Sequence, residues 1–78
     1  MPTALRLGPY RIYFYSHEPN EPPHVHIDRD ELSCKFWLNP VALAHNFGFG
    51  AKQLREIEKI ITENQKNLME AWYDYFGH

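Results

Sequence analysis

Residues 21–28 read Glu21-Pro22-Pro23-His24-Val25-His26-Ile27-Asp28, and this segment decides the fold that we expect for the chain. Two prolines lead into an alternation of imidazole and apolar side chains. Successive strand residues point to opposite faces, so His24 and His26 project from one face while Val25 and Ile27 project from the other. The segment therefore predicts a strand over residues 24–27 whose polar face bears two side chains suited to proton transfer or metal ligation.

The residues that follow extend this strand into a hairpin. Residues 32–38 form the next strand, and the charged residues 28–31 form the turn between them. With Arg29 and Asp30 at the centre of the turn, Ile27 pairs with Leu32 and His24 lies opposite Lys35. This pairing gives one continuous apolar face, which collects Val25, Ile27, Leu32, Cys34, Phe36 and Leu38. The other face collects His24, His26, Ser33, Lys35 and Trp37.

A third strand is predicted upstream of the hairpin. Residues 10–15 read Tyr10-Arg11-Ile12-Tyr13-Phe14-Tyr15 and are rich in the aromatic and β-branched side chains that favour strands. The strand follows the turn signal Gly8-Pro9, and a proline-containing loop over residues 16–23 separates it from the hairpin. The more apolar set makes the better core, namely Tyr10, Ile12 and Phe14. We therefore expect Arg11, Tyr13 and Tyr15 on the face that bears the histidines.

The second half of the chain predicts helices. Asn39-Pro40 is typical of a helix cap followed by proline at the first helical position, so residues 41–46 are expected to form a short helix. The main helix begins at Gly50 or Ala51 and runs to about Phe76, with Gly77 as its stop. The expected fold is α+β: a three-stranded antiparallel sheet, with a short helix and one long C-terminal helix packed on one face. Residues 1–78 form a single domain.

Composition limits the classes of function. The formal net charge is −2, so any nucleic-acid binding depends on a local patch and not on global attraction. Cys34 is the single cysteine, which excludes an intrachain disulfide and a cysteine-rich zinc site, and we expect it to be a small buried hydrophobe. No apolar run is long enough to span a membrane, so we expect a cytoplasmic protein without a membrane partner. The 15% aromatic content exceeds what a thin core needs, which favours a partner surface and a possible homo-oligomer.

The histidine face gathers the groups that RNA cleavage needs. His24 and His26 are the candidate general acid or base, and Lys35 is the candidate for neutralising the phosphate together with Arg11. Candidate contacts with nucleic acid are Arg11, Tyr13, Tyr15 and Trp37, because cations bind phosphate and rings stack on bases. A 2′-hydroxyl can attack its own phosphate under acid/base catalysis, so this hypothesis needs no cofactor and no metal.

Two other interpretations of the same face stay open. Two imidazoles on alternate strand positions could share a zinc ion, but the ion would need a further ligand from His17, Glu21 or Asp28. Alternatively, the face is covered by a partner chain or by the protein's own loops, and the chain is a non-catalytic module that binds a protein or DNA as part of a regulator. A metal-binding protein and a binding module are therefore the alternatives to a metal-independent ribonuclease.

Several segments together resemble a known family. These are Arg11 to Tyr15, Asn20-Glu21-Pro22-Pro23-His24-Val25-His26, Lys35-Phe36-Trp37-Leu38-Asn39-Pro40, Leu54 to Ile57 and Trp72 to Gly77. They are similar to the bacterial and archaeal "domain of unknown function 4160" proteins, for which no activity is established. The resemblance implies a small stand-alone cytoplasmic protein. Members are often encoded beside a small protein of the 2442 family, an arrangement that looks like a toxin–antitoxin pair and implies a cognate protein partner. Gly50 stands where such chains commonly have serine, which implies a weaker helix cap.

Overall fold

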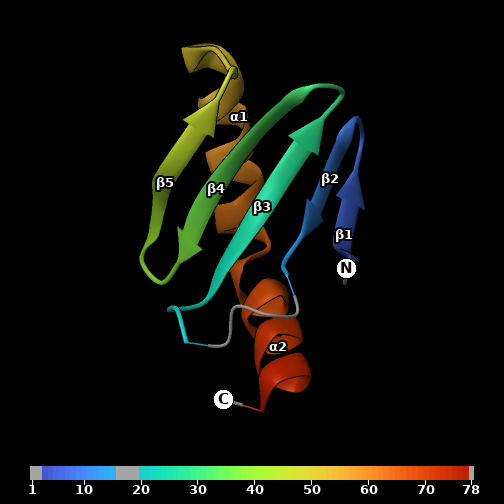
Figure 1. The fold of residues 1–78 in the computed structure, drawn as a ribbon, viewed down its shortest axis with the longest axis vertical. Helices are drawn as coiled ribbons and strands as arrows, with labels where there is room; N and C mark the ends of the chain where they lie inside the picture. The colour runs from blue at the N-terminus through green and yellow to red at the C-terminus, as the bar shows by residue number, and fades with distance from the viewer. Residues whose placement is uncertain (1–2, 16–19, 78) are drawn as a thin grey trace.

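The computed structural model describes residues 3–15 and 20–77, which form a five-stranded antiparallel sheet with one helix behind one of its faces and a second helix that continues past the end of the sheet (Figure 1). The strands lie in the sheet in their chain order. They are β1 (Thr3–Leu7), β2 (Tyr10–Tyr13), β3 (His24–Arg29), β4 (Leu32–Leu38) and β5 (Val41–Phe47). The helices are α1 (Ala51–Glu63) and α2 (Gln65–Phe76). The α+β class fits, but the prediction of a three-stranded sheet with a short helix and one long helix is wrong.

The core lies between the sheet and the helices. Val25 and Ile27 of β3 are both 0% exposed, and β4 adds Cys34, Phe36 and Leu38, which are also buried. From the helices come Ile57, Ile61 and Leu68. Each such aliphatic or aromatic side chain contributes about 1.5–3 kcal/mol when it leaves water. The apolar face predicted for the hairpin is thus confirmed, with Leu32 half-buried at its end.

The turn of the β3–β4 hairpin differs from the predicted one. Arg29 pairs with Leu32, which puts Asp30 and Glu31 at the centre of the turn in place of Arg29 and Asp30. Asp30 adopts a left-handed conformation with φ of 54°, which aspartate tolerates better than most residues. Moving the centre by one residue moves every partner by two, so His24 lies opposite Trp37 and not Lys35. A shift of two leaves each side chain on its predicted face.

Residues 41–47 form strand β5, so the short helix predicted there is wrong. Ala42, Leu43 and Ala44 favour a helix by propensity, but the unpaired edge of β4 needs backbone partners. Pairing supplies them and also buries part of Val41 against the core. Asn39 and Pro40 make the turn between the two strands, joined by a cis peptide bond, and do not cap a helix. Tertiary pairing therefore overrides local preference in this segment.

Strand β5 contains one irregularity that sets which way its side chains point. Lys35 pairs with His45, yet the next residue, Phe36, pairs with Leu43, so Ala44 is an extra residue on the β5 side. Such a bulge shifts the alternation of side chains by one position. Val41 and Leu43 share the helix-facing side with Leu38 and Phe36, their partners on β4. After the bulge, His45 shares the opposite side with Lys35.

The first strand was not predicted at all. β1 pairs with β2 across a turn formed by Gly8 and Pro9, and Leu7 lies opposite Tyr10. Gly8 has a φ of 56°, a conformation that glycine adopts without steric cost. Leu5 packs against the core from this strand. The turn signal was therefore correct, and the strand before it extends the sheet.

The predicted long helix is divided into two at Asn64. Asn64 leaves helical geometry, with φ of −112° and ψ of 12°, while its backbone amide and its side-chain amide both donate to the Ile60 carbonyl, at 3.1 and 2.8 Å. The side chain of Gln65 then donates to the Leu38 carbonyl at 2.6 Å and ties the start of α2 to the end of β4. The outer limits at Ala51 and Phe76 are as predicted, and Gly77 caps the end with a φ of 79°. At the other end, the Gly50 amide donates to the Gln53 side chain.

Cys34 is 1% exposed, as predicted for a small hydrophobe, and its burial leads to a prediction about alkaline stability. Burial, with a smaller contribution from the Asp28 carboxylate, raises the pKa of the thiol from 9.0 to about 12. Below pH 9 the thiol is protonated in both the folded and the unfolded chain. Between pH 9 and 12 only the unfolded chain loses its proton, so the free energy of unfolding is expected to fall as the pH rises.

Urea denaturation at a series of pH values checks this expectation. The Cys34→Ala variant should lose stability less steeply between pH 9 and 12, because it has no thiol to ionise. The two proteins are compared by the slope of the free energy of unfolding against pH. The stability that the smaller alanine side chain loses is the same at every pH, so it does not affect this slope. Burial, hydrogen bonding to Tyr15 and Asp28, and their charges also raise the pKa of Tyr13, but that group is present in both proteins. If stability fell equally steeply with pH in the wild-type protein and the variant, ionisation of Cys34 would not be the cause of the loss.

Candidate functional site

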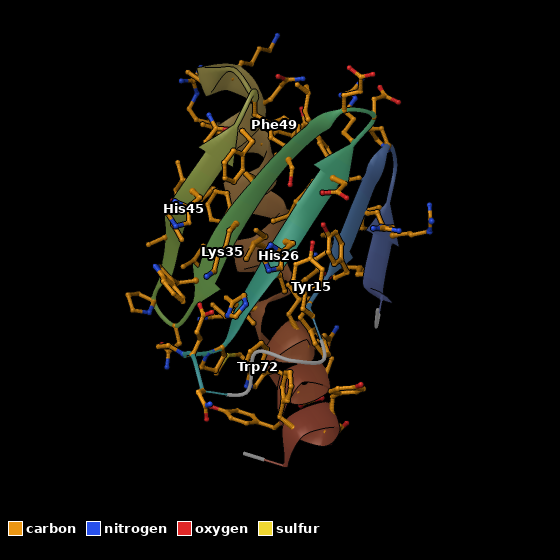
Figure 2. The ribbon with its side chains drawn as sticks, in the orientation of Figure 1. Tyr15, His26, Lys35, His45, Phe49 and Trp72 are labelled. Carbon is orange, nitrogen blue, oxygen red and sulfur yellow. The ribbon has the colours of Figure 1, made fainter. Side chains whose placement is uncertain are left out.

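The face of the sheet opposite the helices, here called the open face, bears the residues of interest. Strand pairing arranges them in rows that cross the sheet, because directly opposed residues point to the same side. The central row consists of Tyr13, His26, Lys35 and His45, each opposite the next. One flanking row consists of Arg6, Arg11, Asp28, Ser33 and Phe47, and the other of His24, Trp37 and Ala42. Figure 2 shows His26, Lys35 and His45 on three neighbouring strands.

His26, in the central row, is in contact with two tyrosine rings. Its ring stacks on Tyr13, with centroids 5.4 Å apart and planes 23° apart, and it meets the Tyr15 ring edge-on at 4.6 Å. Tyr13 is only 4% exposed, and its hydroxyl donates to Asp28 at 3.0 Å. Tyr13 and Tyr15 therefore share a side with His26, as predicted. Tyr13, however, supports the imidazole from below and presents little surface of its own.

His24 is adjacent to His26 but is not exposed. The two rings are 5.3 Å apart and nearly perpendicular. His24 is 0% exposed, because the Trp72 ring from α2 lies 4.9 Å away and the Trp37 ring 5.7 Å away. Its Nδ1 atom donates to the Pro22 carbonyl at 2.9 Å and so anchors the loop that enters β3. The expectation that both imidazoles are exposed to solvent is wrong for His24.

The two cations predicted for this face are each paired with a carboxylate. The Lys35 ammonium lies 2.6 Å from Glu21 and 4.6 Å from the centre of the Trp37 ring, and its side chain is 12% exposed. The Arg11 guanidinium lies 3.4 Å from Asp28 and 4.5 Å from the centre of the Tyr13 ring. The structure thus brings Lys35 and Trp37 together, as predicted. Glu21 now joins them from the loop.

Two residues of β5 complete the open face and were missed from sequence. His45 is exposed opposite Lys35, and Phe47 is 66% exposed opposite Ser33. Their rings are 6.2 Å apart. No role was predicted for His45, which lies in the segment expected to form a short helix. The turn signal at Asn39-Pro40, interpreted as a hairpin turn, would have paired this segment with β4.

The arrangement of acidic side chains bears on the metal hypothesis. Across residues 3–15 and 20–77, no group of three or more histidine, cysteine or carboxylate side chains could hold an ion. Glu21 and Asp28, which were candidates for the further ligand, are paired with Lys35 and with Arg11 and Tyr13. The third candidate, His17, lies outside the described residues.

Most of the chain matches a known protein family. Residues 10–73 match the family described as a domain of unknown function, DUF4160. The chain belongs to this family. The match begins with β2 and ends within α2, and it includes the whole central row: Tyr13, His26, Lys35 and His45. No curated protein and no solved structure matches the chain.

Among the described residues, neither helix has the length and apolar content that crossing a bilayer requires.

Proposed function

We propose that this DUF4160 protein binds single-stranded RNA across the open face of its sheet. The observation that supports the proposal is the central row, in which strand pairing places Lys35 between His26 and His45, one on each neighbouring strand. Cations for phosphate and flat rings for bases are the two features that recur in surfaces that bind single strands. Here they are arranged across a sheet on which an extended chain can lie.

The distribution of charge agrees with this proposal. Arg6, Arg11 and Lys35 lie on the open face, where Asp28 and Glu21 pair with two of them. The helices have a net charge of −1, because residues 51–76 contain five acidic side chains, Glu56, Glu58, Glu63, Glu70 and Asp74, against four basic ones, Lys52, Arg55, Lys59 and Lys66. The open-face residues named here carry one more positive than negative charge, and this small local excess favours the open face for a polyanion although the chain as a whole has a formal charge of −2.

Exposure decides which side chains would contact the RNA. Phe47 is the most exposed large ring in the described residues, and a base can stack on it. His26 and His45 are accessible, whereas His24 has no exposed surface, so we assign the contact to the first two. Of the predicted nucleic-acid contacts, Arg11, Tyr15 and Trp37 are partly exposed. Tyr13 is buried, so it would support the His26 ring and would not contact the RNA itself.

A binding assay tests the proposal. Fluorescence anisotropy with a labelled single-stranded RNA should show binding that weakens as salt increases, because phosphate contacts release counterions. The Phe47→Ala substitution should weaken binding by about 1–3 kcal/mol, which is about five- to 150-fold. The matched control is Tyr73→Ala, which removes another exposed ring (45% exposed) from α2. Equal effects of the two substitutions would contradict the placement of RNA on the open face.

The proposal extends to a toxin–antitoxin-type role with a second small protein. If the chain is the member that acts on RNA, a cognate protein would cover the open face and displace labelled RNA in the same assay. The alternative is a non-catalytic module that binds a protein. The observation that favours it is the pair of exposed rings on α2, Tyr73 and Tyr75 (45% and 52% exposed). In that case Tyr73→Ala should weaken capture of the cognate protein, and RNA should not compete.

A further inference from the structure

We propose that His26 and His45 act as a general acid and base on either side of Lys35, so that the open face cleaves RNA at a phosphate held over the lysine. The inference rests on the proposed RNA binding and goes beyond it by assigning a reaction and a second catalytic imidazole. It arises from the pairing of β5 with β4, which places a residue without any predicted role directly opposite Lys35.

The geometry supports a two-sided mechanism. β4 lies between β3 and β5, so His26 and His45 are separated by one intervening strand. Neighbouring strands are about 4.8 Å apart, which puts the backbones of the two histidines about 10 Å apart. A phosphate above Lys35 would therefore have one imidazole on each side. In-line displacement at phosphorus needs this arrangement, because the attacking and leaving oxygens lie on opposite sides.

The bulge at Ala44 is what completes this arrangement. Without the extra residue, strict alternation from Val41 and Leu43 would direct His45 towards the helices. With it, His45 faces the same side as Lys35 and His26. Bulges that redirect a side chain are common beside active sites. Tyr13 and Tyr15 fix the His26 ring, as described above, while His45 is exposed and can approach a bound chain.

The reaction balances without any further reagent. One imidazole accepts the proton of the ribose 2′-hydroxyl as its oxygen attacks the adjacent phosphorus. The bond from phosphorus to the 5′-oxygen breaks, and the second imidazole donates a proton to that oxygen. Once the phosphate has displaced the Glu21 carboxylate from Lys35, the ammonium stabilises the negative charge that develops on the non-bridging oxygens. The products are a 2′,3′-cyclic phosphate and a free 5′-hydroxyl, and a DNA strand cannot react because it lacks the nucleophile.

The test uses the full chain and an oligonucleotide with a single ribonucleotide in a DNA background, in the presence of EDTA. We expect cleavage at that one position, with a cyclic phosphate detected by mass spectrometry, and no cleavage of the all-DNA strand. His26→Gln and His45→Gln should each lower the single-turnover rate by a factor of about 10²–10⁴, with the dissociation constant changed less than threefold. Lys59→Gln, on the exposed surface of α1, is purified alongside as the control and should cleave normally.

A second substrate separates the two roles. When the 5′-oxygen is replaced by sulfur, the leaving group departs without a proton, so the variant that lacks the acid should recover its rate and the other should not. If the sulfur substrate rescued both variants, or neither, the assignment of one histidine as the acid and the other as the base would be overturned. RNA binding without cleavage by the wild-type protein would overturn this inference and leave the binding function standing. Failure of the wild-type protein to bind RNA would overturn both.

Discussion

Replacing Trp72 with alanine is expected to lower the free energy of unfolding by about 3–5 kcal/mol. Trp72 is 1% exposed and lies among the rings of Phe14, Phe76 and His24, with centroids 5.6, 4.3 and 4.9 Å away. Removing the indole leaves a cavity between α2 and the end of the sheet that its rigid neighbours cannot fill. For a domain of this size the expected loss is a large part of the total stability.

Urea denaturation followed by circular dichroism measures this effect without relying on the indole as the probe. The matched control is Tyr73→Ala, which removes the next side chain of α2. Because that ring is 45% exposed, the control should change stability by less than about 0.5 kcal/mol. Similar losses in the two variants would show that Trp72 does not close the end of the core. In the Trp72→Ala variant, solvent should also reach the His24 ring.

Replacing Glu21 with glutamine is expected to strengthen RNA binding about tenfold, whereas most substitutions at a binding face weaken it. The Glu21 carboxylate lies 2.6 Å from the Lys35 ammonium, in the position that a phosphate oxygen would take. Glutamine keeps the size of the side chain and removes its charge. An incoming phosphate then meets an unpaired cation and no longer meets a nearby anion, and 1.4 kcal/mol of improved electrostatics corresponds to a factor of ten.

A double-mutant cycle gives this prediction its control. Lys35→Met keeps the apolar stem and removes the charge, so it should weaken binding and flatten the dependence on salt. In the Lys35→Met background, Glu21→Gln should have a much smaller effect, because the two groups act through each other. Stability should change little in the Glu21→Gln variant, since its carboxylate side chain is 40% exposed. A tenfold gain that persists without Lys35 would show that Glu21 acts through general repulsion.

The sequence was sufficient to define the faces of the central hairpin. Strands repeat every two residues, so the alternation from His24 to Leu38 assigns each side chain to a face even when the turn is misplaced by one position. The same reasoning placed Tyr13 and Tyr15 beside His26. Family membership was also predicted correctly, from motifs that lie within the matched residues.

Features that depend on distant residues could not be predicted in this way. Strand β5 forms because an edge of β4 needs partners, and its residues alone favour a helix. The direction of His45 depends on the bulge at Ala44, for which the chain shows no local signal. His24 is buried by Trp72, which comes from the far end of the chain. The division of the long helix lies at one residue, Asn64, whose non-helical backbone angles (φ −112°, ψ 12°) the spacing of the apolar side chains does not reveal.

The bulge in β5 also affects how this protein behaves among its own copies. β5 is an outer strand that lacks charged residues and proline, a composition that commonly invites another chain to add itself to a sheet. The side chains of a regular strand alternate between the two sides of a sheet without interruption. Such a strand could match the alternation of β5 before Ala44 or after it, but not along the whole of β5. The bulge therefore makes this edge a poorer template for a strand from another copy of the protein.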